Sequence, residues 1–166
     1  CVFTQSRDAL GNPQRDPFSS TYVSTFGEVG DLSALLHAEA LKRGYASART
    51  VVFLGDGAEW IWNMVQDRFR GAVEIVDFYH ACEHLHLLCQ TLETDPLRTQ
   101  ALYRAWRRRL KRNGLPRLLE EVAQRALTLD AATRESLADQ LRYFHTNAQR
   151  MTYRTFRRKG YFIGSG

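Results

Sequence analysis

Two acidic residues, Asp56 and Asp77, each follow directly after an apolar run that reads as a buried β-strand. These runs are Val51–Leu54 and Val73–Val76. Strands without polar alternation are covered on both faces of a sheet, and the segment between these two is long enough for a crossover helix. The strands are therefore predicted to be parallel neighbours, with both carboxylates at the edge where open α/β sheets place their chemistry.

Asp56 lies between Gly55 and Gly57, and glycines at a strand end let a ligand approach the backbone closely. Mg²⁺ prefers carboxylate oxygens and keeps several waters, so one or two aspartates together with substrate phosphates are enough to hold it. We therefore interpret Asp56 as a ligand of Mg²⁺ or Mn²⁺. A second interpretation stays open, in which Asp56 only caps the helix expected from Ala58 to Phe69.

His80, Glu83 and His84 match the pattern H-x-x-E-H, in which two histidines one helical turn apart bind zinc and the glutamate acts as a base. A catalytic zinc normally has a third protein ligand, which the pattern itself does not supply. The more ordinary interpretation places His80 beside Asp77 at the strand end. A zinc peptidase is therefore kept only as a remote alternative.

The 166 residues have the composition of an ordinary globular protein and are enough for one domain with a substantial core. No apolar stretch approaches the roughly 20 residues of a membrane-spanning helix, and the N-terminus lacks the pattern of a signal peptide. Three cysteines without C-x-x-C spacing argue against a disulfide framework and against a zinc ribbon. These features predict a cytoplasmic protein that does not bind membranes.

Positive charge is concentrated in the second half of the chain. Residues 1–95 carry 7 Lys and Arg against 13 Asp and Glu, whereas residues 96–166 carry 16 against 5. Two runs that combine cations with aromatic residues predict contacts with the phosphate backbone of double-stranded DNA. The candidate DNA-binding residues of these runs are Arg104, Trp106, Arg107, Arg108, Arg109, Lys111 and Arg112, followed by Arg154, Arg157, Arg158 and Lys159.

The first half of the chain reads as strands and helices in alternation. Val2–Gln5 and Thr21–Phe26 are predicted to pair in antiparallel fashion, and Asp31 is expected to cap a helix that ends before Gly44. Together with the two apolar strands and the helix between them, these elements predict one mixed sheet with flanking helices.

The second half reads as a helical block. Pro96 and Pro116 suit the first turns of helices, and apolar residues recur at helical spacing. A last short strand is predicted at Tyr161–Ile163. The expected helices are His80–Leu92, Pro96–Arg112, Pro116–Leu127 and Ala131–Arg150.

Three segments closely resemble bacterial insertion-sequence transposases of the IS-Kra group. They are GDGAEWIWN (Gly55–Asn63), IVDFYHACEHL (Ile75–Leu85) and NAQRMTYRTFRRKGYFIGSG (Asn147–Gly166). The opening CVFTQ and the segment RDPFSSTYV resemble the same group, so the resemblance spans essentially the whole chain. Such transposases belong to the DDE class, have a ribonuclease H-like catalytic core and are akin to Mutator-like transposases.

The resemblance implies an α/β fold in which residues 1–91 form part of a ribonuclease H-like core. Residues 92–150 would form an all-helical insertion, and residues 151–166 would return to the core. It also implies Mg²⁺-dependent cleavage and strand transfer at transposon ends by a bacterial, nucleoid-associated homo-oligomer. Asp56 corresponds to the second acid of the catalytic triad, and Asp77 with His80 matches a D-x-x-H element of Mutator-like relatives.

The chain departs from the complete pattern of the family, in which the first catalytic Asp precedes Cys1 and the catalytic Glu follows Gly166. We therefore expect a core that is incomplete at both ends and a chain that is inactive by itself, since two of three acids would be missing. The alternative in another functional class is a non-catalytic DNA-binding remnant.

Overall fold

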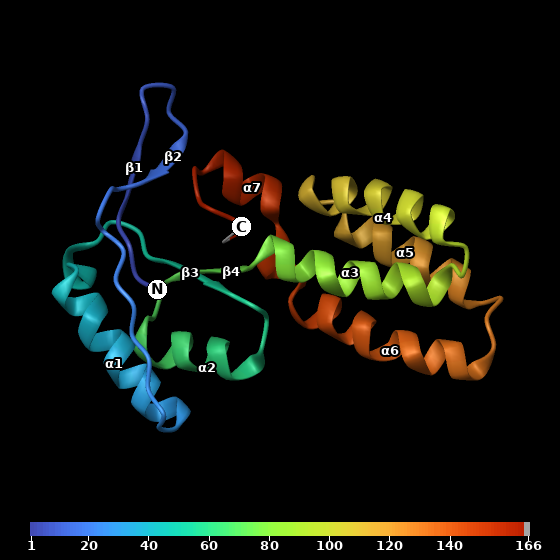
Figure 1. The fold of residues 1–166 in the computed structure, drawn as a ribbon, viewed down its shortest axis with the longest axis horizontal. Coiled ribbons are helices and arrows are strands. Elements are labelled where there is room, and N and C mark those ends of the chain that lie inside the picture. The colour runs from blue at the N-terminus through green and yellow to red at the C-terminus, as the bar shows by residue number, and fades with distance from the viewer. Residues whose placement is uncertain (165–166) are drawn as a thin grey trace.

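The two apolar runs form strands β3 (Val52–Gly55) and β4 (Val73–Val76), which pair in parallel with Gly55 opposite Val76. Helix α2 (Glu59–Arg68) connects them, as the sequence predicts. The computed structural model describes residues 1–164. In this part of the chain it is a mostly helical α/β protein with seven α-helices and two small sheets (Figure 1).

The N-terminal segment forms a hairpin of its own, made of β1 (Gln5–Arg7) and β2 (Pro13–Arg15). The predicted pairing of Val2–Gln5 with Thr21–Phe26 is wrong except for one bridge between Val2 and Thr21. The Asp8 carboxylate accepts hydrogen bonds from the backbone N–H groups of Leu10 and Asn12, at 2.9 and 2.7 Å. This turn closes the hairpin earlier in the chain than the sequence predicts. Within residues 1–164 the hairpin and the pair of β3 and β4 are two separate sheets, where one mixed sheet was predicted.

Helix α1 (Val29–Lys42) begins three residues earlier than predicted. Glu28 is its N-cap, and Asp31 lies in the first turn, where its carboxylate accepts a hydrogen bond from the Glu28 N–H at 3.0 Å. The pair forms a capping box, which satisfies backbone donors that a helix N-terminus leaves unpaired. The helix ends before Gly44, whose φ of 85° is left-handed, as expected for the residue after a helix.

The second half of the chain is a block of helices that extends from the carboxyl end of β4 (Figure 1). Helix α3 packs between α4 and α6, and the aspartates Asp77, Asp95 and Asp130 cap α3, α4 and α6. The predicted helices are confirmed, with ends that differ by a few residues. The block contains α3 (Phe78–Leu92), α4 (Pro96–Lys111), α5 (Leu115–Ala126), α6 (Ala131–Thr146), the 3₁₀ helix η2 (Ala148–Met151) and α7 (Tyr153–Arg158).

The predicted last strand, Tyr161–Ile163, is absent as a strand. The segment runs back along the start of α3, and the Ile163 carbonyl accepts one hydrogen bond from the Phe78 N–H at 2.7 Å. None of the helices in residues 1–164 is both long enough and apolar enough to cross a membrane.

One apolar core joins the small sheet to the helical block. Trp106 on α4 is 1% exposed and Phe144 on α6 is fully buried, and both belong to the same cluster as Ile75 on β4. Trp106 was predicted to contact DNA, and its burial shows that this prediction is wrong. The apolar surface that an indole buries is worth more in the core than on the surface of a basic helix.

Replacement of the Trp106 indole tests this assignment. We expect Trp106→Ala to lower the free energy of unfolding by about 3–5 kcal/mol, because it leaves a cavity in the core. Urea denaturation followed by circular dichroism measures the change. Arg108→Ala, an exposed change on the same helix, should shift stability by less than about 0.5 kcal/mol. Equal effects of the two changes would contradict the buried position of Trp106.

Candidate functional site

Asp56 and Asp77 lie one residue beyond the last register pair of β3 and β4, so both carboxylates stand at the same end of the sheet. The Asp77 N–H donates to the Gly55 carbonyl at 2.7 Å, which continues the pairing up to these residues. Asp56 is exposed and Asp77 is half-buried. The prediction that both strand-end acids lie at one edge of the sheet is therefore confirmed.

Each carboxylate also has a local structural role. An Asp56 side-chain oxygen, Oδ1, accepts a hydrogen bond from the Ala58 N–H at 2.8 Å at the start of α2. Asp77 caps α3, with Oδ1 accepting from the N–H groups of Tyr79 and His80 at 2.8 and 3.3 Å. Because a carboxylate has about four lone-pair positions, the bond to Oδ1 of Asp56 leaves capacity for a cation at that residue. Ala58 is the N-cap residue of α2, so Asp56 supports the turn before the helix and is not its N-cap.

Helix α6 holds the turn that carries Asp56. The Tyr143 hydroxyl donates to the Asp56 carbonyl at 2.9 Å, and the Asn147 amide donates to the Gly57 carbonyl at 3.3 Å. The Asn147 side-chain oxygen also accepts a hydrogen bond from the indole N–H of Trp62 at 3.0 Å. We call Tyr143 and Asn147 the α6 clamp.

The clamp leaves no room for a side chain at Gly57. This residue has a φ of 104°, and a Cβ atom there would lie 2.7 Å from Cε2 of Tyr143. The Gly55-Asp56-Gly57 sequence thus serves two needs: a left-handed backbone and close approach of a helix from a distant part of the chain.

Tyr143 lies among the acidic groups of the strand edge. Burial of its ring raises the pKa of the hydroxyl well above the usual value, and the nearby negative charges of Asp56, Asp77 and Glu83 raise this pKa further. The hydroxyl therefore stays protonated at neutral pH and acts as a hydrogen-bond donor to the turn.

The residues of the H-x-x-E-H pattern face the same region but do not form a zinc site. The imidazole Nδ1 of His80 lies 3.1 Å from the Glu83 carboxylate, while His84 stacks on Tyr143 and places Nδ1 2.7 Å from the Gln140 side-chain oxygen. Within residues 1–164, no three His, Cys, Asp or Glu side chains are grouped so as to hold a metal ion. The pair of histidines thus has no third ligand in this part of the chain.

The strand-end acids supply some of the ligands of a magnesium site. Asp56 and Asp77 supply two carboxylates, which suit a single Mg²⁺ completed by phosphate oxygens and water. A complete two-ion site needs further acids, and the described residues do not provide a third one at this edge. The donor set therefore fits part of a magnesium site.

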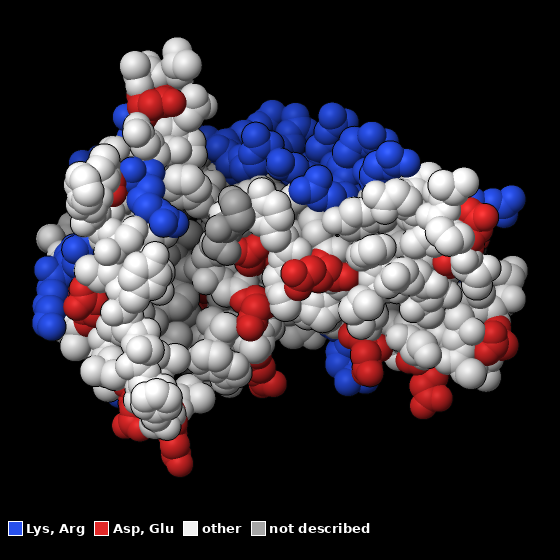
Figure 2. Space-filling model, viewed as in Figure 1, with Lys and Arg blue, Asp and Glu red and all other residues white. Residues whose placement is uncertain are grey.

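The two basic runs of the sequence come together in space. Asn113 follows α4 with a left-handed φ of 64°, and its side chain accepts from the Arg154 N–H and donates to the Thr155 hydroxyl, both at 2.8 Å. These bonds fix α7 beside the end of α4. Lys and Arg side chains gather along this edge of the molecule, over α7 and α4 (Figure 2).

The candidate DNA-binding cations do not all lie in equivalent positions. Arg109 pairs with Glu121 on α5, whereas Arg107 and Lys111 lie over the Phe78 ring, at 5.2 and 5.4 Å from its centroid. The others are exposed. We define the basic surface as the cations of α4 and α7 other than Arg98 and Arg109, together with the residue that follows each helix: Arg104, Arg107, Arg108, Lys111, Arg112, Arg154, Arg157, Arg158 and Lys159.

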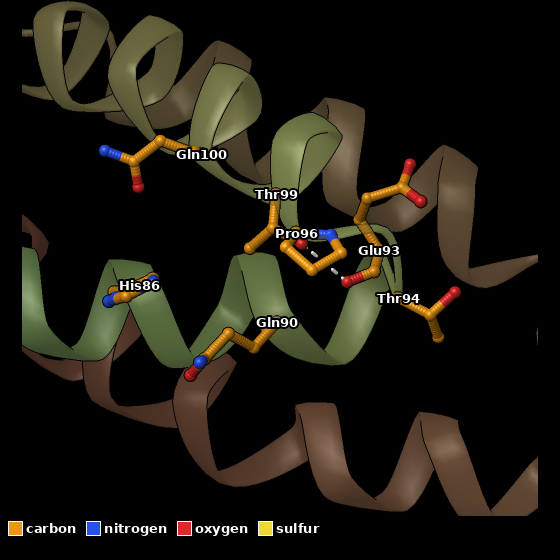
Figure 3. A pocket seen from close by; sticks show the side chains of 7 residues that line it. All are labelled: His86, Gln90, Glu93, Thr94, Pro96, Thr99 and Gln100. Carbon is orange, nitrogen blue, oxygen red and sulfur yellow. Dashed lines mark hydrogen bonds between the residues drawn. The ribbon is translucent and has the colours of Figure 1, made fainter.

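A pocket of about 370 Å³ lies at the other end of α3, away from the carboxylates. His86 and Gln90 of α3 and Thr99 and Gln100 of α4 point toward it, and Glu93 lies in the connection between the helices (Figure 3). The Thr99 hydroxyl donates to the Glu93 carbonyl at 2.8 Å, so this group completes the start of α4. We assign no chemistry to this pocket.

Comparison of the chain with protein-family models, with curated proteins and with solved structures gives no significant match. The function therefore has to be argued from the site and from the sequence motifs.

The sequence interpretation missed the residues that hold the site. Tyr143, Asn147 and Gln140 all lie on or directly after α6, in a segment that was read only as part of the helical block. One signal was available, because the segment that resembles transposases begins at Asn147. A buried asparagine at the end of a helix requires partners, but the sequence does not say which.

The α6 clamp predicts that loss of the hydroxyl group affects stability differently at Tyr143 and at Tyr153. Tyr143→Phe should lower the free energy of unfolding by about 1 kcal/mol, because the Asp56 carbonyl loses its donor. Tyr153→Phe should leave stability unchanged or raise it by up to about 1 kcal/mol, since the buried Tyr153 hydroxyl has no hydrogen-bond partner among the described residues. Denaturant unfolding of the two variants makes the comparison. A larger loss for Tyr153→Phe than for Tyr143→Phe would contradict the clamp.

Proposed function

We propose that this chain is part of a DNA transposase of the DDE class with a ribonuclease H-like core. In this proposal Asp56 and Asp77 belong to a Mg²⁺-dependent phosphoryl-transfer site, and the basic surface binds DNA. The resemblance of three separate sequence segments to the IS-Kra group supports the proposal, as does the parallel arrangement of β3 and β4. The parent enzyme would act as a homo-oligomer on transposon ends and target DNA, in the bacterial nucleoid.

The observation that carries the proposal is that cations of the basic surface lie against the residue that follows Asp77. Phe78 follows Asp77 in the chain, and its ring lies under the side chains of Arg107 and Lys111 of α4. A DNA backbone bound along α4 and α7 would therefore run close to the strand-end carboxylates. Phosphoryl transfer needs this combination, since the cations position the phosphates and the acids hold the metal.

The basic surface, the two aspartates and the His80–Glu83 pair would have different roles in the reaction. The basic surface neutralises phosphate charge and fixes the register of the duplex. Asp56 and Asp77 offer carboxylate oxygens, and Mg²⁺ bound there would activate a water or a 3′-hydroxyl and stabilise the leaving oxygen. The Glu83 carboxylate, 3.1 Å from Nδ1 of His80, would orient this imidazole at the start of α3, next to Asp77.

A non-catalytic DNA-binding module is the second candidate, favoured by the basic surface alone. Both candidates predict DNA binding that weakens with salt, but only the transposase predicts that metal binding depends on Asp56. By itself the 166-residue chain is expected not to cleave DNA under either proposal, because the resemblance places two of the three catalytic acids outside it.

DNA binding can be tested with the chain as it stands. The Kd for a 30-base-pair duplex should rise steeply with salt, and changing both Arg108 and Arg158 to Gln should reduce the slope of log Kd against log salt by up to about 2. Fluorescence anisotropy at several salt concentrations measures both quantities.

The matched control removes the same charge from the opposite side of the helical block. Arg134 and Arg142 lie on α6, which runs along the other side of α3 from α4 (Figure 1). Changing both to Gln should leave the salt slope within experimental error. If the two double variants lose affinity equally, the basic surface is not the DNA site.

The metal site has its own test. In the presence of duplex DNA, Asp56→Asn should weaken Mn²⁺ binding at least about 10-fold, because a carboxylate ligand is replaced by a neutral amide. Water-proton relaxation reports the affinity without any need for cleavage. Asp67→Asn removes an exposed carboxylate at the far end of α2 and should change nothing. Equal Mn²⁺ affinity of wild type and Asp56→Asn would favour the DNA-binding module.

A further inference from the structure

A second pocket, of about 260 Å³, lies where the hairpin, α3, α4 and α7 meet. The start of α3 contributes Phe78 and Tyr79, while α4 and α7 contribute Lys111 and Arg157 from their last turns. The returning segment that contains Tyr161 lines another side. This volume is slightly below the usual range for ligand sites, so the pocket suits one planar group and an attached charge rather than a whole base pair.

The two cations of this pocket have no anionic partner in the described protein. No Asp or Glu within residues 1–164 forms an ion pair with Lys111 or Arg157. Lys111 instead lies over the ring of Phe78. Two like charges that line one pocket favour the binding of an anion, and a phosphate group has the charge and oxygens that both side chains bind.

Aromatic residues form a second part of the pocket lining. Tyr79 is 47% exposed, Tyr161 is half-buried, and the ring of Phe162 is held edge-on by Phe3 at 5.8 Å. Aromatic faces that remain accessible beside cations bind nucleobases by stacking, because every base has a π-face. A ligand that combines an anionic group with a flat ring is a nucleotide.

The hairpin fixes one side of the pocket to α7. The Gln5 side chain donates to the Gly160 carbonyl at 2.7 Å, and the Arg7 guanidinium donates to the Lys159 carbonyl at 2.9 Å. Asn12 and Pro13 at the tip side of the hairpin line the pocket. The pocket is thus lined by the hairpin, α3, α4, α7 and the returning segment, and hydrogen bonds hold the hairpin to the residues that follow α7.

One lining residue of the pocket, Gly164, lies close to Asp77. Gly164 lies against the Tyr79 ring, and a Cβ atom at Gly164 would be 3.4 Å from Oδ1 of Asp77. A nucleotide in the pocket would therefore place its neighbour in the strand beside the acidic edge.

From these features we infer that the pocket binds one unpaired nucleotide of a DNA strand, with the base against the tyrosine rings and the phosphate on Lys111 and Arg157. The inference rests on the proposed function for its ligand, DNA, and adds that the site captures a nucleotide that has left its duplex.

A pair of DNA probes tests it: a 20-base-pair duplex with blunt ends and the same duplex with one unpaired 5′-phosphorylated nucleotide. The unpaired nucleotide should improve the Kd about 10-fold, the magnitude expected for one stacked base. Changing Lys111 and Arg157 to Gln should remove this preference. Tyr79→Leu should also remove it, and Tyr79→Phe should keep it because the ring remains.

Changing Arg108 and Arg158 to Gln is the matched control, since these cations belong to the basic surface but do not line the pocket. It should weaken both probes equally and keep their ratio. Thermal unfolding of every variant verifies that the fold is intact. A preference that survives the loss of Lys111 and Arg157, or equal binding of the two probes by the wild type, overturns the inference.

Titration with thymidine 5′-monophosphate separates failure of the pocket from failure of the proposed function. Saturable binding that is lost in the Lys111 and Arg157 double variant upholds a nucleotide pocket, even if neither duplex binds. Inorganic phosphate that binds as tightly as the nucleotide overturns the role of the rings. Absence of nucleotide binding, together with intact duplex binding, overturns the pocket and leaves the proposed function standing.

Discussion

Helix α6 holds the turn after β3 through a buried amide, and the sheet and the helical block are joined at this point. Asn147 is 2% exposed and serves three groups: the Trp62 indole, the Gly57 carbonyl and the Tyr143 carbonyl. Loss of these partners would leave a buried polar group without a hydrogen bond, which lowers the free energy of unfolding by about 1–3 kcal/mol. Arg150 adds a half-buried ion pair with Glu74 on β4, at 2.6 Å, on the same side.

This arrangement positions the two candidate metal ligands by different means. Asp77 is placed locally, because it is both the end of a strand and the cap of the next helix. Asp56 depends on a helix more than eighty residues away, since the Tyr143 hydroxyl holds its carbonyl. A shift of the helical block would therefore move one acid relative to the other. The geometry of the acidic edge is a property of the joined structure.

The cations of the basic surface repel one another, and none of them forms an ion pair with an acid within residues 1–164. The stability of this surface has a local explanation: Arg108 and Lys111 lie in the last turn of α4, and Arg157 and Arg158 in the last turn of α7. Cations near a helix C-terminus are stabilised by the unpaired carbonyls and the helix dipole, by about 0.3–1 kcal/mol each. The helix ends offset the mutual repulsion and leave the charges available to phosphates.

The sequence by itself determined the parallel strands, the helices and the strand-end acids, because apolar periodicity and caps such as Asp77 act within a few residues of the chain. The sequence prediction misplaced the first strand pair. It also put Trp106 on the surface, because cations next to a residue in the sequence do not reveal which face of the helix packs against the core. Only the tertiary structure decided the α6 clamp, whose partners lie 85 to 90 residues apart, and the merging of two basic runs through Asn113. Such contacts depend on how distant elements pack, and no local pattern encodes that packing.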